Sequence, residues 1–311
     1  MYKSILELKT KDRCNYVIEM SPDNNNIFFS FNEQGYIMSK EEFLKLEEKN
    51  LNSLNNNNKN EIPIFNLEDT ISNAKFTSNK KNIFISDQTK TITKYNLDEN
   101  NKGEQTDKSI LNIKNLKTWK FIINSEKGIM ATGGNNIFIY DYVNDKILKE
   151  IDNKNKFVYS FCFLSNNKLA VGHSTGSIYI YDMETSNKEN KIEEHCLLVR
   201  NLAYNHDKNI LYSASDDLHI NQINIDNLKL SSPMVGHKEP ISNMIYNDNK
   251  KMLITSSFDG TIKLWDVKGK NNCVETLEPN NKSPIWDIAV SHDGDFIAYT
   301  ATEGIGAFAL K

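Results

Sequence analysis

The sequence predicts an all-β fold, a closed ring of seven blades called a β-propeller. Two observations predict it. Residues 236–267 hold three short apolar or alternating runs of strand length, separated by the turn-forming segments Asn247–Lys250 and Phe258–Gly260. Similar runs recur along the chain at intervals of 41 to 45 residues, the length of a four-stranded blade. A single blade cannot bury its own faces, so neighbouring repeats must cover them.

The repeat is marked by a residue pair that ends one strand of each of five units. These pairs are Trp265-Asp266, Ile223-Asn224, Tyr181-Asp182, Tyr140-Asp141 and Tyr95-Asn96. Seven units follow, over residues 10–40, 63–98, 110–142, 152–184, 194–226, 236–268 and 278–311. We therefore treat residues 1–311 as a single propeller domain.

Each unit begins its innermost strand with a similar run. The seven runs are Tyr16–Met20, Ser72–Phe76, Trp119–Ile123, Tyr159–Phe163, Arg200–Tyr204, Ser242–Tyr246 and Trp286–Val290. The last unit stops after its third strand, whereas Ser4–Leu8 precedes the first unit and belongs to none. We expect Ser4–Leu8 to form the outer strand of the seventh blade, because this closure leaves no open end in the ring.

One insertion interrupts the repeat, at about residues 41–61. Its first part, Glu41–Asn50, has the composition of a short helix. Its second part, Asn52–Asn60, is rich in asparagine and too polar to bury surface. We expect a flexible insertion between two blades, because the entropy of loop closure grows slowly with loop length.

Composition narrows the class of protein. Acidic and basic residues number 41 and 37, a net charge of −4, which argues against a broad nucleic-acid-binding face. No apolar run reaches the length of a membrane span, and the first residues do not begin a signal peptide. Cys14, Cys162, Cys196 and Cys273 lack the spacing of metal ligands, so we interpret them as reduced thiols. We expect a cytoplasmic protein, with the nucleus as a further location.

Two blades carry a histidine, a hydroxyl residue and an aspartate at matching positions. They are His237, Asp259 and Ser256 or Ser257, completed by Trp265, and in the preceding blade His195, Asp217 and Ser213 or Ser215. A buried imidazole between a carboxylate and a hydroxyl satisfies its polar groups and fixes the strand register. The same residue types form nucleophilic triads in enzymes. Because the trio recurs at the blade spacing inside a sheet, we favour the structural role.

No other motif supports catalysis or a cofactor. Gly172–Gly176 matches G-x-S-x-G, but that motif needs a strand-to-helix turn, and Ser174 lies between two predicted strands. We therefore predict a hairpin turn there. The isolated histidines show no metal-ligand spacing, and no glycine-rich phosphate loop precedes a helix. The sequence predicts neither an enzyme nor a cofactor or metal site.

The first residues of the innermost strands form the candidate binding site. We expect them to meet at one rim of the central channel: Tyr16, Ser72, Trp119, Tyr159, Arg200, Ser242 and Trp286. Aromatic residues and arginine are enriched at protein–protein interfaces. We predict that the four aromatic residues contact a protein partner and that Arg200 is a bidentate donor to a partner carboxylate. The alternative is that the aromatic residues only plug the channel mouth.

With this repeat, the chain resembles the WD-repeat family over essentially its whole length. The most specific residues are Gly236-His237 and Trp265-Asp266, which open and close one blade. Within that family, residues 192–311 are most similar to the WD-repeat subunit of the superkiller (SKI) RNA-decay complex. The residues that carry this similarity are Val199–Tyr204, Ser213–Asp217 and Ile285–Ile288. The first 150 residues match only as generic blades.

The resemblance implies a non-enzymatic scaffold subunit of a multiprotein complex. Such subunits dock the top of the propeller onto a tetratricopeptide scaffold that holds an RNA helicase, and Arg200 and Trp286 match the family's top-surface positions. We expect a monomeric propeller in a hetero-complex, without direct contact to nucleic acid or membrane. The alternatives are a chromatin- or transcription-associated adaptor and a peptide reader. A reader of basic tails would need an acidic residue, which the seven rim positions lack.

Overall fold

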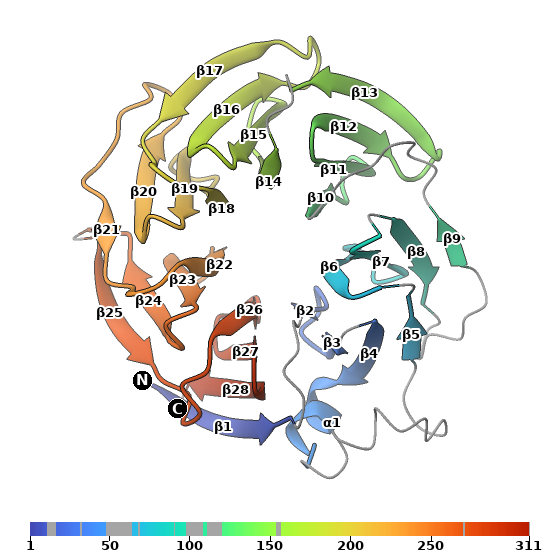
Figure 1. Cartoon of the computed structure of the whole chain (residues 1–311), viewed down its shortest axis with the longest axis vertical. Coiled ribbons are helices and arrows are strands. Elements are labelled where there is room, and N and C mark those ends of the chain that lie inside the picture. The colour runs from blue at the N-terminus through green and yellow to red at the C-terminus, as the bar shows by residue number, and fades with distance from the viewer. Residues whose placement is uncertain are drawn as a thin grey trace.

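Figure 1 shows the computed structural model, a ring of blades viewed along its axis. The structure describes residues 1–10, 17–31, 33–47, 64–67, 69–89, 91–97, 108–110, 120–153, 157–269 and 271–310. These residues form seven four-stranded sheets, one for each blade. The predicted seven-bladed all-β propeller is confirmed.

The first six blades follow the chain in order, each from its innermost strand outward (Figure 1). The first contains β2 (Ile18–Met20), β3 (Asn26–Phe31), β4 (Gln34–Ser39) and β5 (Ile64–Asn66). The second contains β6 (Ile71–Phe76), β7 (Asn82–Asp87), β8 (Ile92–Asn96) and β9 (Lys108–Ile110). The third contains β10 (Phe121–Asn124), β11 (Ile129–Gly133), β12 (Asn136–Asp141) and β13 (Lys146–Asp152).

The remaining blades repeat this order. The fourth contains β14 (Val158–Phe163), β15 (Lys168–His173), β16 (Ser177–Asp182) and β17 (Lys188–Glu193). The fifth contains β18 (Val199–Asn205), β19 (Ile210–Ser215), β20 (His219–Asn224) and β21 (Met234–Val235). The sixth contains β22 (Ile241–Asn247), β23 (Met252–Ser257), β24 (Ile262–Asp266) and β25 (Asn272–Leu277). The seventh contains β26 (Ile285–Val290), β27 (Phe296–Ala301), β28 (Gly304–Leu310) and, from the other end of the chain, β1 (Tyr2–Lys9).

The ring is closed by β1, which pairs with β28 in antiparallel register from Tyr2–Leu310 to Lys9–Gly304. The predicted outer strand of the seventh blade is therefore confirmed, and it is longer than Ser4–Leu8. Gly304 permits the close approach of the two strands, because a Cβ atom there would overlap the carbonyl oxygen of Leu8. The N–H of Tyr2 also donates to Glu275 of the sixth blade at 2.9 Å. The first strand thus holds two blades together.

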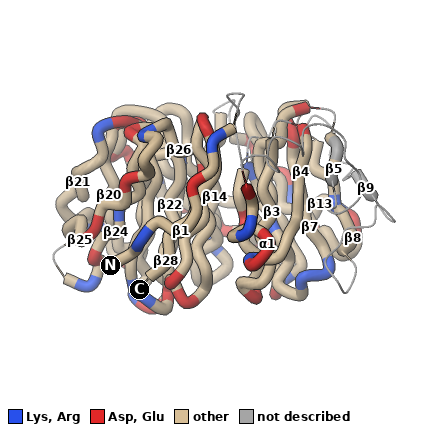
Figure 2. The backbone as a smooth tube through the Cα atoms, turned by 90° about the horizontal axis from the view of Figure 1, so that it is seen from below, with Lys and Arg blue, Asp and Glu red and all other residues tan. Residues whose placement is uncertain are grey.

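The hydrophobic core lies between neighbouring blades. One cluster combines Leu264 of the sixth blade with Ile288 and Tyr299 of the seventh, all of them buried. A second combines residues of the seventh and first blades. Figure 2 shows the ring from the side, with acidic and basic segments interspersed around it. Each blade therefore depends on its neighbours for burial, as expected of a repeat architecture.

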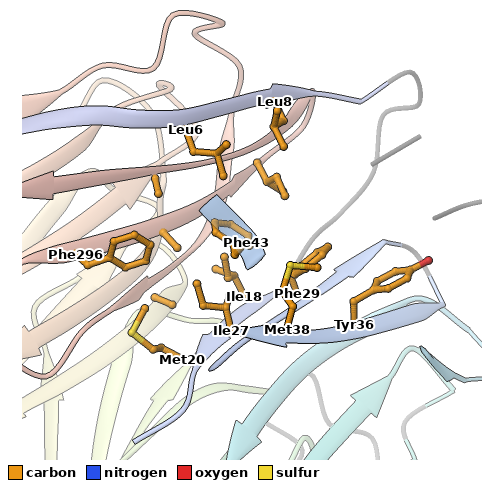
Figure 3. Packing of buried hydrophobic residues seen from close by; sticks show 14 of the residues in the cluster. Leu6, Leu8, Ile18, Met20, Ile27, Phe29, Tyr36, Met38, Phe43 and Phe296 are labelled. Atoms are coloured by element: carbon orange, nitrogen blue, oxygen red, sulfur yellow. The ribbon is translucent and has the colours of Figure 1, made fainter. Parts of the chain in front are cut away.

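A short helix, α1 (Lys40–Leu44), lies at the seam between the first and last blades. Ser39 and Glu42 form a capping box, in which the Ser39 hydroxyl accepts from the Glu42 N–H at 3.2 Å. Phe43 is fully buried, and its ring lies 5.8 Å from that of Phe29 in β3. Figure 3 shows Phe43 among side chains of β1 and of the first blade.

The start of the insertion is thus a helix that fills a gap between blades. The expected short helix is confirmed over residues 40–44, and residues 48–61 lie outside the described residues. Within the described part of the chain, no helix is long and apolar enough to cross a membrane.

Deletion of residues 1–9 should lower the melting temperature by more than about 10 °C, because it opens the ring and exposes the edge of β28. Differential scanning calorimetry of the purified variant measures this shift. Lys3→Ala, an exposed change in the same strand, serves as control and should melt like the wild type. Unchanged melting of the deletion would contradict closure by β1.

Phe43→Ala should destabilise the protein by about 3–5 kcal/mol, because it leaves a cavity in the seam between two blades. Urea unfolding followed by tryptophan fluorescence measures the loss. Glu41→Ala alters the exposed face of the same helix and should cost less than about 1 kcal/mol. Equal effects of the two changes would mean that α1 contributes nothing to the seam.

Candidate functional site: the mouth of the central channel

The innermost strands surround a cavity of about 360 Å³ on the axis of the ring. Five of the seven predicted rim residues line it: Ser72, Tyr159, Arg200, Ser242 and Trp286. Tyr16 and Trp119, the other two, lie outside the described residues. The structure thus brings together the rim residues that it describes, at the mouth of one channel.

A β-bulge lies at each of these five residues. The register between the innermost strand and its neighbour skips one residue in the second, fourth, fifth, sixth and seventh blades. The skipped residues are Ser72, Tyr159, Arg200, Ser242 and Trp286. A bulged residue leaves the ladder, and its side chain takes a direction that regular alternation would not give. The positions of the rim residues therefore follow from the bulges in their strands.

Four side chains form a connected array across three blades, here called the rim array: Arg200, Asp216, Phe258 and Trp286. The Arg200 Nε and Nη2 atoms donate to the two carboxylate oxygens of Asp216, each at 2.7 Å. The guanidinium lies over the Phe258 ring, 5.5 Å from its centroid. The Phe258 and Trp286 rings meet edge to face at 4.8 Å. These contacts fix the rim array in one arrangement.

The Asp216 contact corrects one prediction. We expected Arg200 to offer its bidentate fork to a partner carboxylate, but Asp216 of the same chain occupies that fork. A partner carboxylate would have to displace Asp216. The sequence shows Asp216 only as a turn residue, because its pairing depends on how the turn after β19 folds over the bulge in β18. Sequence reasoning also missed Phe258, which lies in the turn after β23.

Below the rim, the residue that follows the bulge links neighbouring blades in the second, fourth, fifth, sixth and seventh blades. Asn73 donates to the Phe121 carbonyl at 2.9 Å, Ser160 to that of Val199 at 2.9 Å, and Asn201 to that of Ser242 at 2.7 Å. Asp287 accepts from the Ile18 N–H of the first blade at 3.0 Å and from the side chain of Asn243 in the sixth. These bonds satisfy buried backbone groups and hold the inner ring in register.

Two lysines also line the channel. Lys75 pairs with Glu19 of the first blade at 2.5 Å. Lys120 of the third blade donates to the Asn201 Oδ1 atom at 2.6 Å and to the Arg200 carbonyl at 3.5 Å, both in the fifth blade. Burial lowers the pKa of Lys120 to about 8. The charges of Arg200 and Lys75 add to this shift, and Asp287 opposes it.

The histidine sets lie inside the blades. His195 contacts Asp217 through Nδ1 at 2.9 Å and Ser213 through Nε2 at 2.8 Å. His237 contacts Asp259 through Nδ1 at 2.9 Å and Thr255 through Nε2 at 2.8 Å. Both imidazoles are buried between a carboxylate and a hydroxyl, so their geometry is that of a structural hydrogen-bond network.

The hydroxyl partner of His237 differs from the prediction. We expected Ser256 or Ser257, but Thr255 takes this place and also accepts from the Trp265 indole N–H at 2.9 Å. Ser256 instead lies 2.9 Å from Ser242, and Ser257 donates to the Glu239 carbonyl at 2.8 Å. A shift of one residue moves a side chain to the other face of a strand, so the choice among three successive hydroxyls depends on register.

The remaining motif candidates take structural places. Residues 174–176 form the turn between β15 and β16, so the G-x-S-x-G match is a hairpin as predicted. His173, which the sequence analysis did not single out, is buried, and its ring packs 4.5 Å from that of Tyr179. Among the described residues, no group of three or more histidine, cysteine or acidic side chains is placed to hold a metal ion.

A family model described as "WD domain, G-beta repeat" matches residues 228–266 and 271–304. The first match spans β21 to β24 and the second includes β25 to β27. The first match therefore joins the outer strand of the fifth blade to three strands of the sixth, and the second joins the outer strand of the sixth blade to two strands of the seventh. Because of this offset, each repeat contributes strands to two blades, and β1 supplies the outer strand of the last blade.

Several relatives with modest identity also match parts of the chain. The target of rapamycin complex subunit wat1 of Schizosaccharomyces pombe is 23% identical over 48% of this chain and 48% of its own length. The non-catalytic subunit wdr4 of a tRNA (guanine-N(7)-)-methyltransferase of Dictyostelium discoideum is 25% identical over 54% of this chain and 40% of its own. The human WD repeat-containing protein 43 is 31% identical over 33% of this chain and 15% of its own. Each match covers less than half of the relative.

Stability should fall as the pH drops from 7 to 5, because burial lowers the pKa of His237 below its ordinary value of 6.5. The folded state then binds fewer protons than the unfolded state, so this contribution is complete above pH 6.5 and is lost at lower pH. Burial alone would raise the pKa of Asp259, but hydrogen bonds from His237 and neighbouring residues outweigh burial and lower this pKa. Protonation of Asp259 therefore adds a second loss of stability, below pH 3.8.

Urea unfolding at pH 7 and at pH 5 measures the loss of stability that comes from His237. His237→Gln should reduce the dependence of the unfolding free energy on pH by as much as about 1.4 kcal/mol per pH unit. His206→Gln, in an exposed turn, should leave it unchanged. The same pH dependence in wild type and His237→Gln would contradict the assignment.

Proposed function

We propose that this chain, a WD40-repeat β-propeller, is a non-enzymatic adaptor that docks a protein partner on the mouth of its central channel. The rim array is the observation that carries the proposal. It presents Arg200, Phe258 and Trp286 on one partly exposed surface, with the Arg200 side chain 26% exposed. Fixed aromatic and arginine side chains lose little entropy on binding, which favours them as interface anchors.

The names of the relatives agree with such a role. One is a subunit of a protein complex and another is the non-catalytic subunit of an enzyme. The WD repeats support a scaffold in general. Docking through the channel mouth leaves the outer strands accessible, so one propeller can contact several proteins at once.

Our finer proposal concerns the assembly. We propose a SKI-like RNA-decay complex, in which a tetratricopeptide protein occupies the channel mouth and an RNA helicase is held beside it. The motifs at Val199–Tyr204, Ser213–Asp217 and Ile285–Ile288 support it, since they supply Arg200, Asp216 and Trp286. We place this assembly in the cytoplasm, with the nucleus as a further site.

The peptide-reader alternative is less well supported by the rim. A reader of basic tails needs an aromatic face and a carboxylate for the incoming cation. Here Arg200 already occupies both, since it lies over Phe258 and pairs with Asp216. A foreign cation would have to displace it.

Affinity purification of the tagged native protein, followed by mass spectrometry, tests the proposal. We expect a tetratricopeptide protein and a helicase to copurify with the wild type. Recovery of an unrelated stable complex would contradict the finer proposal and keep the adaptor role, whereas recovery of the chain alone would contradict both.

Trp286→Ala and Phe258→Ala should each abolish copurification while lowering the melting temperature by no more than about 5 °C, because rim side chains contribute little to the core. Lys208→Glu, in the turn after β18 at the opposite end of the channel, is the matched control and should retain the partners. Retention of all partners by both rim variants would place the interface elsewhere.

A further inference from the structure

A second cavity, of about 270 Å³, adjoins the turn that carries Phe258. This turn connects β23 to β24 in the sixth blade (Figure 1). It borders both cavities, because Phe258 lines the channel mouth whereas residues 259–261 line the second cavity. A partner segment that docks on the channel mouth and continues over the sixth blade would therefore reach the second cavity.

Three lysines line this cavity, here called the lysine pocket. Its lining residues are Lys238, Lys263, Lys282, Gly236, Thr276, Glu278 and residues 259–261. The ammonium of Lys263, in β24, donates to the Thr276 hydroxyl of β25 at 2.9 Å, and this acceptor is neutral. None of the three lysines forms an ion pair with an acidic side chain in the described part of the chain. The pocket therefore gathers positive charge that no described acidic side chain neutralises by direct contact.

Two acidic residues also line the lysine pocket, and one of them is fully engaged. The Asp259 Oδ2 atom accepts from His237 Nδ1 and from the Lys238 backbone N–H, each at 2.9 Å. Its Oδ1 atom accepts from the Thr261 N–H at 2.9 Å and from the Thr261 hydroxyl at 2.7 Å. These four bonds leave neither oxygen for the lysine ammonium groups. The other residue, Glu278, is exposed, so the pocket holds three ammonium groups beside one accessible carboxylate.

The lysine pocket is held in shape by the turns around it. Gly260 has a φ of +79°, and a Cβ atom there would lie 2.9 Å from the Lys282 carbonyl oxygen, so glycine permits the two turns to pack together. The turn before Lys282 is fixed from the other end of the chain. The Asn280 N–H and side-chain amide donate to the Glu7 Oε2 atom in β1, at 3.1 Å and 2.8 Å. The strand that closes the ring therefore also positions this pocket.

We propose that the lysine pocket binds a phosphorylated side chain, phosphoserine or phosphothreonine, in the partner segment that docks on the channel mouth. This inference rests on the proposed adaptor function and names a second anchor of the docking segment. A phosphorylated side chain carries a charge of about −1.5 to −2 at pH 7 and three strong acceptor oxygens. It therefore matches three lysine donors better than a carboxylate, which carries a single charge and two oxygens.

The charges around the lysine pocket give its side chains opposite effects on binding. A phosphate would gain charge-assisted hydrogen bonds from the lysines, which are roughly twice as strong as neutral ones. Glu278 lines the same pocket and would repel the phosphate. Neutralising the lysines should therefore weaken binding, whereas neutralising Glu278 should strengthen it. A purely structural role of these residues would not give effects of opposite sign.

Peptide arrays probed with the purified full chain test the proposal. Each array carries phosphoserine, phosphothreonine, serine, threonine or glutamate at one fixed position among otherwise random residues. We expect the wild type to retain the phosphorylated peptides above all the others, and the variant with both Lys238→Gln and Lys282→Gln to lose this preference. Lys208→Gln, an exposed change at the opposite end of the channel, is the matched control and should keep it. Equal retention of phosphorylated and unphosphorylated peptides, equal retention of glutamate peptides, or a preference that survives the double substitution would each overturn the proposal.

The best phosphopeptide then provides a measurement that does not depend on the folding of a variant. Removal of its phosphate should weaken binding to the wild type by at least about tenfold at pH 7, which is about 1.4 kcal/mol, in fluorescence anisotropy. Glu278→Gln should strengthen binding of the phosphopeptide by about threefold and leave that of the unphosphorylated peptide unchanged. Equal affinities of the two peptides for the wild type, or weaker binding of the phosphopeptide to Glu278→Gln, would overturn the proposal.

The arrays use the isolated protein, so their outcome is separate from that of the copurification. A lysine-dependent preference for phosphopeptides, with no partner copurifying, would contradict only the adaptor assignment. Copurification that depends on the rim, with no preference for phosphopeptides, would contradict only the inference about the lysine pocket.

Discussion

The pairing of β1 with β28 is the contact on which the rest of the structure depends. It brings the first and last described strands into one sheet and covers the edge of β28 at the seam of the ring. The hydrophobic cores lie between blades, so a ring that opened at this seam would expose a face of both the first and the seventh blade. The α1 helix reinforces the same place, since Phe43 fills the gap between these two blades. The α1 helix, at the start of the insertion, therefore contributes to the closure of the ring.

Closure also explains why the channel mouth can act as a fixed surface. Along the inner ring, side chains of Asn73, Ser160 and Asn201 bond the second, fourth and fifth blades to the blades that follow them, and Asp287 connects the seventh blade to the first. Each bulged rim residue directly precedes one of these linking residues in its strand and so lies next to this inner ring. A partner would therefore meet side chains that are already held in position, and binding would not have to order them.

Much of the fold could be predicted because it is encoded locally. Strand-length runs, turn residues and a spacing of 41 to 45 residues suffice to count blades and to place the strand Ser4–Leu8 in the seventh. The rim residues Tyr159, Arg200 and Trp286 were also found, since each begins the predicted run of its innermost strand. What the sequence did not reveal depends on register and on distant contacts. Thr255 replaces Ser256 or Ser257 beside His237, because a one-residue shift changes the face of the strand.

Asp216 and Lys120 are examples of the distant contacts that the sequence did not reveal. Each contacts a residue that the sequence places in a different strand or blade, and neither has a local pattern that marks it. The central claim is that a partner docks on the channel mouth. Hydrogen–deuterium exchange of the native complex against the free protein tests it most directly. We expect protection at the starts of β14, β18 and β26 and in the turn at Phe258, with exchange in β13, β17 and β25 unchanged. Protection confined to those outer strands, or to the turns at the opposite end of the channel, would contradict the account.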